Sequence, residues 1–119
     1  MTTQQIAERL AELCRQGEFE TAQTELFAAD AVSIEPYETP EFAKETKGLD
    51  AIIEKGHKFG SMVEETYGMS VSEPLVGGQS FAVIMSMDMK MKGQDRMNMS
   101  ELCVYEVKDG KIVSESFHM

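Results

Sequence analysis

The side chain best suited to chemistry in this sequence is the carboxylate of Glu101. It lies in a strand-like run, residues 96–107, where it shares one face with apolar side chains. A carboxylate on an apolar face is costly unless it is paired, solvated or neutral. Its functional interpretation is a general base or a group that orients a ligand. Its structural interpretation is an ion pair with His118 or with Lys55.

His118 is the second predicted catalytic residue, because a terminal hairpin would place it opposite Glu101. Asp109-Gly110 between apolar residues is a strong signal for a two-residue turn with positive φ. Directly opposed residues of such a hairpin share a face, with Cβ atoms about 5 Å apart. The register predicts five pairs, which are Lys108 with Lys111, Val107 with Ile112, Tyr105 with Ser114, Cys103 with Ser116, and Glu101 with His118.

Methionines at alternate positions mark the preceding strand, residues 79–91. Period-two alternation is typical of a strand with one buried face. A two-residue turn at Gly93-Gln94 would set these methionines opposite Asn98 and Ser100. A five-residue connection, residues 92–96, keeps apolar residues together, and we prefer it because register follows the hydrophobic face. It pairs Met91 with Met97, Met89 with Met99, and Met87 with Glu101.

These rows of methionines predict the wall of an apolar cavity, because unbranched thioethers adapt to varied ligands. The alternative is that they fill the core beneath the helices. The polar loop 36–48 is long enough to act as a lid, although a solvated connector is the other interpretation. The residues expected to contact a ligand come from the strands, this loop and the flank of the third helix, and they are Met87, Met89, Met99, Cys103, Tyr105, Tyr37 and His57.

Isomerase-like chemistry would need a base and a donor for an enolate oxygen. Tyr105 cannot be that donor for Glu101, because four residues along a strand span roughly 13 Å. Tyr37 or a protonated second group would have to serve. Two scattered histidines form no metal-ligand cluster, and no glycine-rich phosphate loop is present, so neither a metal nor another cofactor is expected.

The order of elements predicts an α+β fold. Helical spacing marks residues 2–17 and a second helix from Phe19, followed by a short strand, 31–35, and a third helix, 49–66. A strand through Met69, Val71 and Leu75 and the strands 79–91, 96–107 and 111–119 then form a meander. We expect one curved antiparallel sheet wrapped around the N-terminal helices, shaped as a cone with an internal pocket.

This order resembles the nuclear-transport-factor-2-like (cystatin-like) superfamily and, within it, the SnoaL-like domains. Three segments carry the resemblance: 26–34 before the first strand, 48–52 at the third helix, and 104–113 at the terminal hairpin. The family includes ketosteroid isomerase, polyketide cyclases, small hydrolases, dehydratases and non-catalytic modules. Its polyketide cyclases often carry an inward Asp seven residues before the hairpin glycine. That position here is Cys103, and Glu101 lies two residues earlier on the same face.

Composition narrows the classes of function. The 119 residues predict a single domain, 1–119, with 42% hydrophobic and 27% charged residues. A net charge of −10 argues against nucleic acid and anionic membrane surfaces as partners. No run approaches the roughly 20 apolar residues of a membrane span. Two cysteines without a disulfide pattern favour a cytoplasmic protein.

The sequence therefore predicts a protein that binds a small apolar molecule in the cone, as an isomerase-, cyclase- or hydrolase-type enzyme. The alternative is a non-catalytic ligand-binding or dimeric protein-interaction module. A homodimer through the outer sheet face is also expected, because that face gathers apolar residues and such patches usually mark interfaces. The residues expected in this patch are Ile84, Leu102, Val104, Phe117 and Val113.

Overall fold

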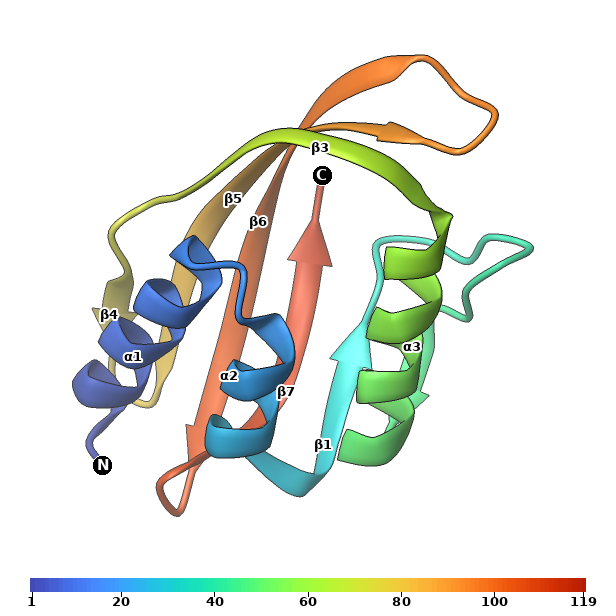
Figure 1. Cartoon of the computed structure of the whole chain (residues 1–119). Coiled ribbons are helices and arrows are strands. Elements are labelled where there is room, and N and C mark those ends of the chain that lie inside the picture. Colours follow the sequence, from blue (N-terminus) through green and yellow to red (C-terminus); the bar gives the residue numbers. More distant parts are fainter.

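The computed structural model describes all residues, 1–119, as three helices on one side of a single curved sheet (Figure 1). The strand order is β2-β1-β7-β6-β5-β3, with β4 paired to β5, and only β1 and β7 run parallel. The fold is therefore the α+β arrangement expected from the sequence. The helices are α1 (Thr3–Arg15), α2 (Phe19–Leu26) and α3 (Leu49–Met62); the strands are β1 (Phe27–Ile34), β2 (Glu45–Lys47), β3 (Val63–Val71), β4 (Leu75–Gly77), β5 (Ser80–Met91), β6 (Arg96–Lys108) and β7 (Lys111–His118).

Helix α1 packs its apolar stripe against the concave face of the sheet. A capping box between Thr2 and Gln5 starts it, since each side chain bonds to the other residue's backbone N–H. Ile6 and Leu10, one turn apart, are almost completely buried in the core. Gly17, with φ of 75°, provides the left-handed conformation that ends the helix.

Helix α3 ends at Met62, four residues before the expected end at Thr66. The chain continues directly as β3, which pairs with β5 along its whole length. The segment Val63–Tyr67 contains β-branched and aromatic residues that suit a strand, and pairing with β5 decides the outcome. At the far end of the same sheet, Glu45–Lys47 of the expected loop forms β2 on the edge of β1.

The hairpin of β5 and β6 keeps the predicted faces but not the predicted register. Lys90 pairs with Arg96, so the methionines are shifted by two residues relative to the predicted pairs. Arg96 is thus a strand residue, and its guanidinium forms two hydrogen bonds to Asp88, at 2.9 and 2.7 Å. A shift of two residues preserves the face of every side chain. The observed pairs are Met89 with Met97, Met87 with Met99, and Met85 with Glu101.

The terminal hairpin contains a β-bulge that the sequence did not reveal. The turn is as predicted, with positive φ at Asp109 and Gly110 and Val107 opposite Ile112. The register then shifts between Val107 and Glu106, and one extra residue turns every later side chain of β7 to the other face. The predicted pairs of Tyr105 with Ser114, Cys103 with Ser116 and Glu101 with His118 are therefore wrong. The observed pairs are Tyr105 with Glu115, Cys103 with Phe117, and Leu102 with His118.

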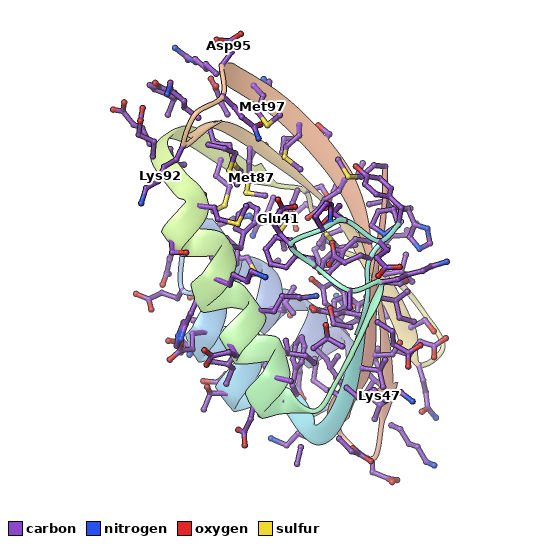
Figure 2. All side chains as sticks on the ribbon, turned by 90° about the vertical axis from the view of Figure 1, so that its right-hand side faces the viewer. Glu41, Lys47, Met87, Lys92, Asp95 and Met97 are labelled. Carbon is purple, nitrogen blue, oxygen red and sulfur yellow. The ribbon has the colours of Figure 1, made fainter.

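The concave face therefore carries side chains in rows across the strands. The four rows are Ser33, Glu115, Tyr105 and Phe81; Phe117, Cys103 and Val83; Glu101, Met85 and Val71; and Met99, Met87 and Met69. In Figure 2 Lys92 lies beside the upper end of α3, where its backbone N–H donates to the Met62 carbonyl, and the hairpin tip at Asp95 extends beyond it. The sheet is thus longer than the helical layer that covers it.

The convex face has no helix over it (Figure 1). Ile84 and Leu102 are directly opposed there and are 50% and 41% exposed. Phe117, which was expected in this patch, lies on the concave face because of the bulge. No helix is long and apolar enough to cross a membrane.

Candidate active site

A cavity of about 370 Å³ lies between the helices and the concave face of the sheet. Fifteen of its 23 lining residues are hydrophobic, so a matching ligand must be largely apolar. In Figure 2, Met87 lies on the sheet side of the upper end of α3, and the loop that carries Glu41 crosses in front of the sheet. The polar lining groups include Glu35, Lys55, Glu101, Tyr105 and Glu115.

Two of these groups, Lys55 and Glu115, are joined through Ser33, which is fully buried, and Lys55 also binds Glu35. The Lys55 ammonium donates to the Ser33 hydroxyl at 2.7 Å and to the Glu35 carboxylate at 3.0 Å. The Ser33 hydroxyl donates to Glu115 Oε2 at 2.6 Å. This relay links a helix and two strands, because Lys55 is on α3, Ser33 on β1 and Glu115 on β7.

Glu115 is the most strongly perturbed carboxyl group of the cavity. It is only 4% exposed, and burial raises its pKa from 4.5 to about 7. The hydrogen bond from Ser33 and the positive charge of Lys55 lower the pKa, whereas the charges of Glu35 and Glu101 raise it. Glu115 can therefore be found both protonated and ionised near neutral pH.

Glu101 faces the cavity without an N–H or O–H donor from the protein. Its nearest partner is the Cys103 thiol, with Sγ at 3.9 Å from Oε1. Burial and then the charge of Glu35 raise the pKa of Glu101, opposed by Cys103 and Lys55. Neither expected ion pair is formed, because Lys55 pairs with Glu35 and His118 lies on the convex face.

Tyr105 is the β6 residue directly opposite Glu115 on the concave face, and it carries a hydroxyl group. The residue is 2% exposed, and its ring stacks on Phe81 with centroids 4.8 Å apart. Its hydroxyl interacts weakly with the Cys103 sulfur. Burial raises the pKa of that thiol, and the hydrogen bond with Tyr105 opposes this rise only in part. Burial and the charge of Glu115 raise the pKa of Tyr105 well above 10, so the group stays a neutral donor.

The loop of residues 36–44 covers one side of the cavity. Phe42 packs against Phe59 of α3, with ring centroids 6.5 Å apart, and Lys58 lies 5.1 Å from the centre of the Phe42 ring. Lys58 also donates to the backbone carbonyl of Glu41. Tyr37 borders the cavity although 60% of its surface is exposed. The loop is therefore attached to α3 by one aromatic contact and one lysine.

The structure brings some of the predicted site residues together and separates others. Those that line the cavity are Glu101, Met87, Met99, Tyr105 and Tyr37. Met89 and Cys103 are buried on the same face but do not border it. His57 is exposed on α3 against Glu20, and His118 bonds to Ser116 at 3.1 Å on the convex face.

The buried carboxyl of Glu115 and the relay through Ser33 were not predicted from the sequence. Residues 114–118 have the sequence Ser-Glu-Ser-Phe-His. Neither of its two alternating sets of side chains is clearly the apolar one, so the sequence does not show which set faces the core. Only the bulge decides that Glu115 is buried. No group of three or more His, Cys, Asp or Glu side chains has an arrangement suited to a metal ion.

Both the sequence and the fold resemble known proteins. A family profile described as a SnoaL-like domain matches residues 1–119. No curated protein matches the sequence. A structure from Mesorhizobium loti is 33% identical, with 100% of both chains covered and a TM-score of 0.93. That protein carries two provisional names, SnoaL-like polyketide cyclase and carbohydrate phosphatase.

More distant structures share the fold alone. An NTF2-like protein of Burkholderia pseudomallei is 13% identical, with 100% of this chain and 92% of that chain covered and a TM-score of 0.79. TerC, crystallised with polyporic acid, is 13% identical over 98% and 90% of the chains, with a TM-score of 0.74. A Catenulispora acidiphila protein with a ketosteroid isomerase-like fold, in complex with trimethylamine, is 16% identical over 96% and 84%, with a TM-score of 0.69.

Proposed function

Because the chain belongs to the SnoaL-like domain family, we propose that its cavity binds a small, largely apolar molecule and moves a proton on it. The reaction class is that of an isomerase or cyclase, in which a proton leaves a carbon next to a carbonyl group. The observation that carries the proposal is the carboxyl group of Glu115, which is almost completely buried at the wall of an apolar cavity.

Glu115 is the proposed base. A general base works best when its pKa is close to the working pH, and burial brings the pKa of Glu115 to about 7. One of its oxygens accepts from Ser33, which leaves the other free for the ligand. The ammonium of Lys55 donates to Ser33, so its charge stabilises the ionised carboxylate through the relay.

Tyr105 is the proposed donor to the developing enolate oxygen. It pairs with Glu115 across β6 and β7, so the donor and the base are nearest neighbours on one face. Tyr105 is too distant from Glu101 along β6 to be its partner, which is the objection to that pairing. Pairing with Glu115 removes that objection, and a neutral phenol in a dry cavity is suited to stabilise an oxyanion.

Hydrogen–deuterium exchange tests the proposal without knowledge of the natural substrate. The probe is 4-phenylbutan-2-one in D2O, in which NMR follows the loss of protons next to the carbonyl. We expect the protein to accelerate this exchange and Glu115→Gln to reduce the acceleration by about 100-fold or more, the usual contribution of a general base. Glu106→Gln, an exposed change on the convex face, is the matched control. Equal acceleration by Glu115→Gln would refute the role of Glu115, and saturable binding without any acceleration would favour a non-catalytic binding module.

We also propose that two copies associate through the convex face and that the protein is cytoplasmic. The exposed pair of Ile84 and Leu102 on a face without helices supports the first proposal. Cys14 and Cys103 are free and buried, which suits a reducing compartment. Sedimentation at micromolar concentration tests the association.

A further inference from the structure

We propose that the ligand of this cavity is a small amine, protonated at neutral pH, whose ammonium group binds the carboxylate of Glu101. This inference rests on the proposed binding function and specifies the chemical class of the ligand. It comes from the charge balance of the cavity, the nature of its walls and the position of the buried Tyr105 hydroxyl.

The cavity contains more negative than positive groups. Glu35, Glu101 and Glu115 supply three carboxyl groups, whereas Lys55 supplies the single ammonium. Lys55 is already bound to Glu35 at 3.0 Å and to Ser33 at 2.7 Å. The carboxylate of Glu101 is therefore left with the Cys103 thiol as its only neighbour of hydrogen-bonding type. A cationic ligand supplies the missing partner, and an anionic ligand would add a further unpaired charge.

The walls around Glu101 suit an alkylated ammonium group better than a hydrated one. Glu101 is directly opposite Met85 on β5, and Phe117 and Met119 also line the cavity. An aromatic face attracts a cation, and apolar thioethers beside it exclude water. The net charge of −10 also raises the local concentration of cations near the protein.

The hydroxyl of Tyr105 favours a ligand that also has a polar group at its other end. This side chain is 98% removed from solvent, and the chain gives its hydroxyl no strong hydrogen-bond partner. Every fully enclosed polar side-chain atom has a partner, so the hydroxyl must border the cavity. Glu101 and Tyr105 are four residues apart on β6, or roughly 13 Å. The ammonium of the ligand and its hydrogen-bond acceptor are thus separated by several bonds.

Three probes with one phenylethyl body and one size separate the effect of charge from that of shape. They are N,N-dimethyl-2-phenylethylamine, which is a cation, 4-phenylbutan-2-one, which is neutral, and 3-phenylpropionate, which is an anion. Their affinities are measured by NMR titration of the whole protein at neutral pH. We expect the amine to bind at least tenfold more tightly than the ketone, since a hydrogen bond to a charged group is worth about 10- to 100-fold. The anion should bind most weakly.

Glu101→Gln identifies the group responsible, because it removes the charge and keeps the shape. This variant should bind the amine and the ketone equally, with ketone affinity within about threefold of the wild type. Glu106→Gln loses the same net charge from the convex face, so it should keep the preference for the amine. An amine that binds no better than the ketone, no amine binding at millimolar concentration, or a preference that survives in Glu101→Gln would each overturn the inference.

The two proposals fail separately. Acceleration of exchange in the ketone without a preference for amines would refute only the inference about the ligand. A preference for amines that depends on Glu101, without any exchange, would refute only the proposed proton transfer by Glu115.

Discussion

The buried carboxyl of Glu115 should make the stability of the protein depend on pH in a direction opposite to that of most acidic residues. Its pKa is about 7 in the folded protein and 4.5 in an exposed chain. A raised pKa means that the folded state holds its proton longer, so the contribution to stability is fully present below about pH 4.5. It is lost as the pH rises through about 7. The difference of about 2.5 pH units corresponds to roughly 3 kcal/mol, of which about 2 kcal/mol falls between pH 5.5 and 8.5.

Urea denaturation of the wild type and of Glu115→Gln measures this effect. The glutamine cannot ionise, so we expect the free energy of unfolding of the wild type, minus that of the variant, to fall by about 2 kcal/mol from pH 5.5 to 8.5. Taking the difference removes the titration of all other groups that the two proteins share. Glu106→Gln should show no such pH-dependent difference, because its side chain is exposed. A difference between wild type and Glu115→Gln that stays constant over this range would show that Glu115 ionises normally, and the proposed base would lose its physical support.

Three further results are expected. Val104→Lys on the convex face should convert a dimer to monomers in sedimentation, and a wild type that is already monomeric at micromolar concentration would contradict the proposed association. Ile52→Ala should lower the free energy of unfolding by about 2–5 kcal/mol in urea, since Ile52 is fully buried, and a loss below 1 kcal/mol would show a poorly packed core. Phe42→Ala should speed the release of 4-phenylbutan-2-one about three- to tenfold in NMR exchange measurements, because it removes the contact with Phe59. An unchanged rate would mean that the loop does not cover the path of the ligand.

The fold could be predicted because its main signals are local. The methionine alternation in β5, the Asp109-Gly110 turn and the capping box at Thr2 each depend on a few neighbouring residues. The order of these elements, together with the family resemblance, then led to the α+β cone. The predicted register between β5 and β6 was wrong by two residues. The prediction that Met87 and Glu101 lie on the concave face was still correct, because a shift by two residues keeps every side chain on its face.

The candidate site could be predicted only in part, because it depends on one bulge. Val113 is the extra residue of this bulge. A valine suits a regular strand equally well, so its residue type does not predict the register shift between β6 and β7. Without the bulge, His118 faces the cavity and Glu115 faces solvent; with it, the two exchange roles. The relay from Lys55 through Ser33 was likewise out of reach, since it joins residues far apart in the sequence through the parallel pairing of β1 and β7.

The ten methionines offer the most direct measurement of whether the ligand binds in the cone cavity. Methionine methyl groups labelled with carbon-13 would be followed by NMR during titration with 4-phenylbutan-2-one. Met87 and Met99 line the cavity, and their signals should shift and saturate together. Met1 and Met62 do not border it and should keep their positions. Shifts confined to Met1 or Met62, or no saturable shift at Met87 and Met99, would contradict the assignment of the site.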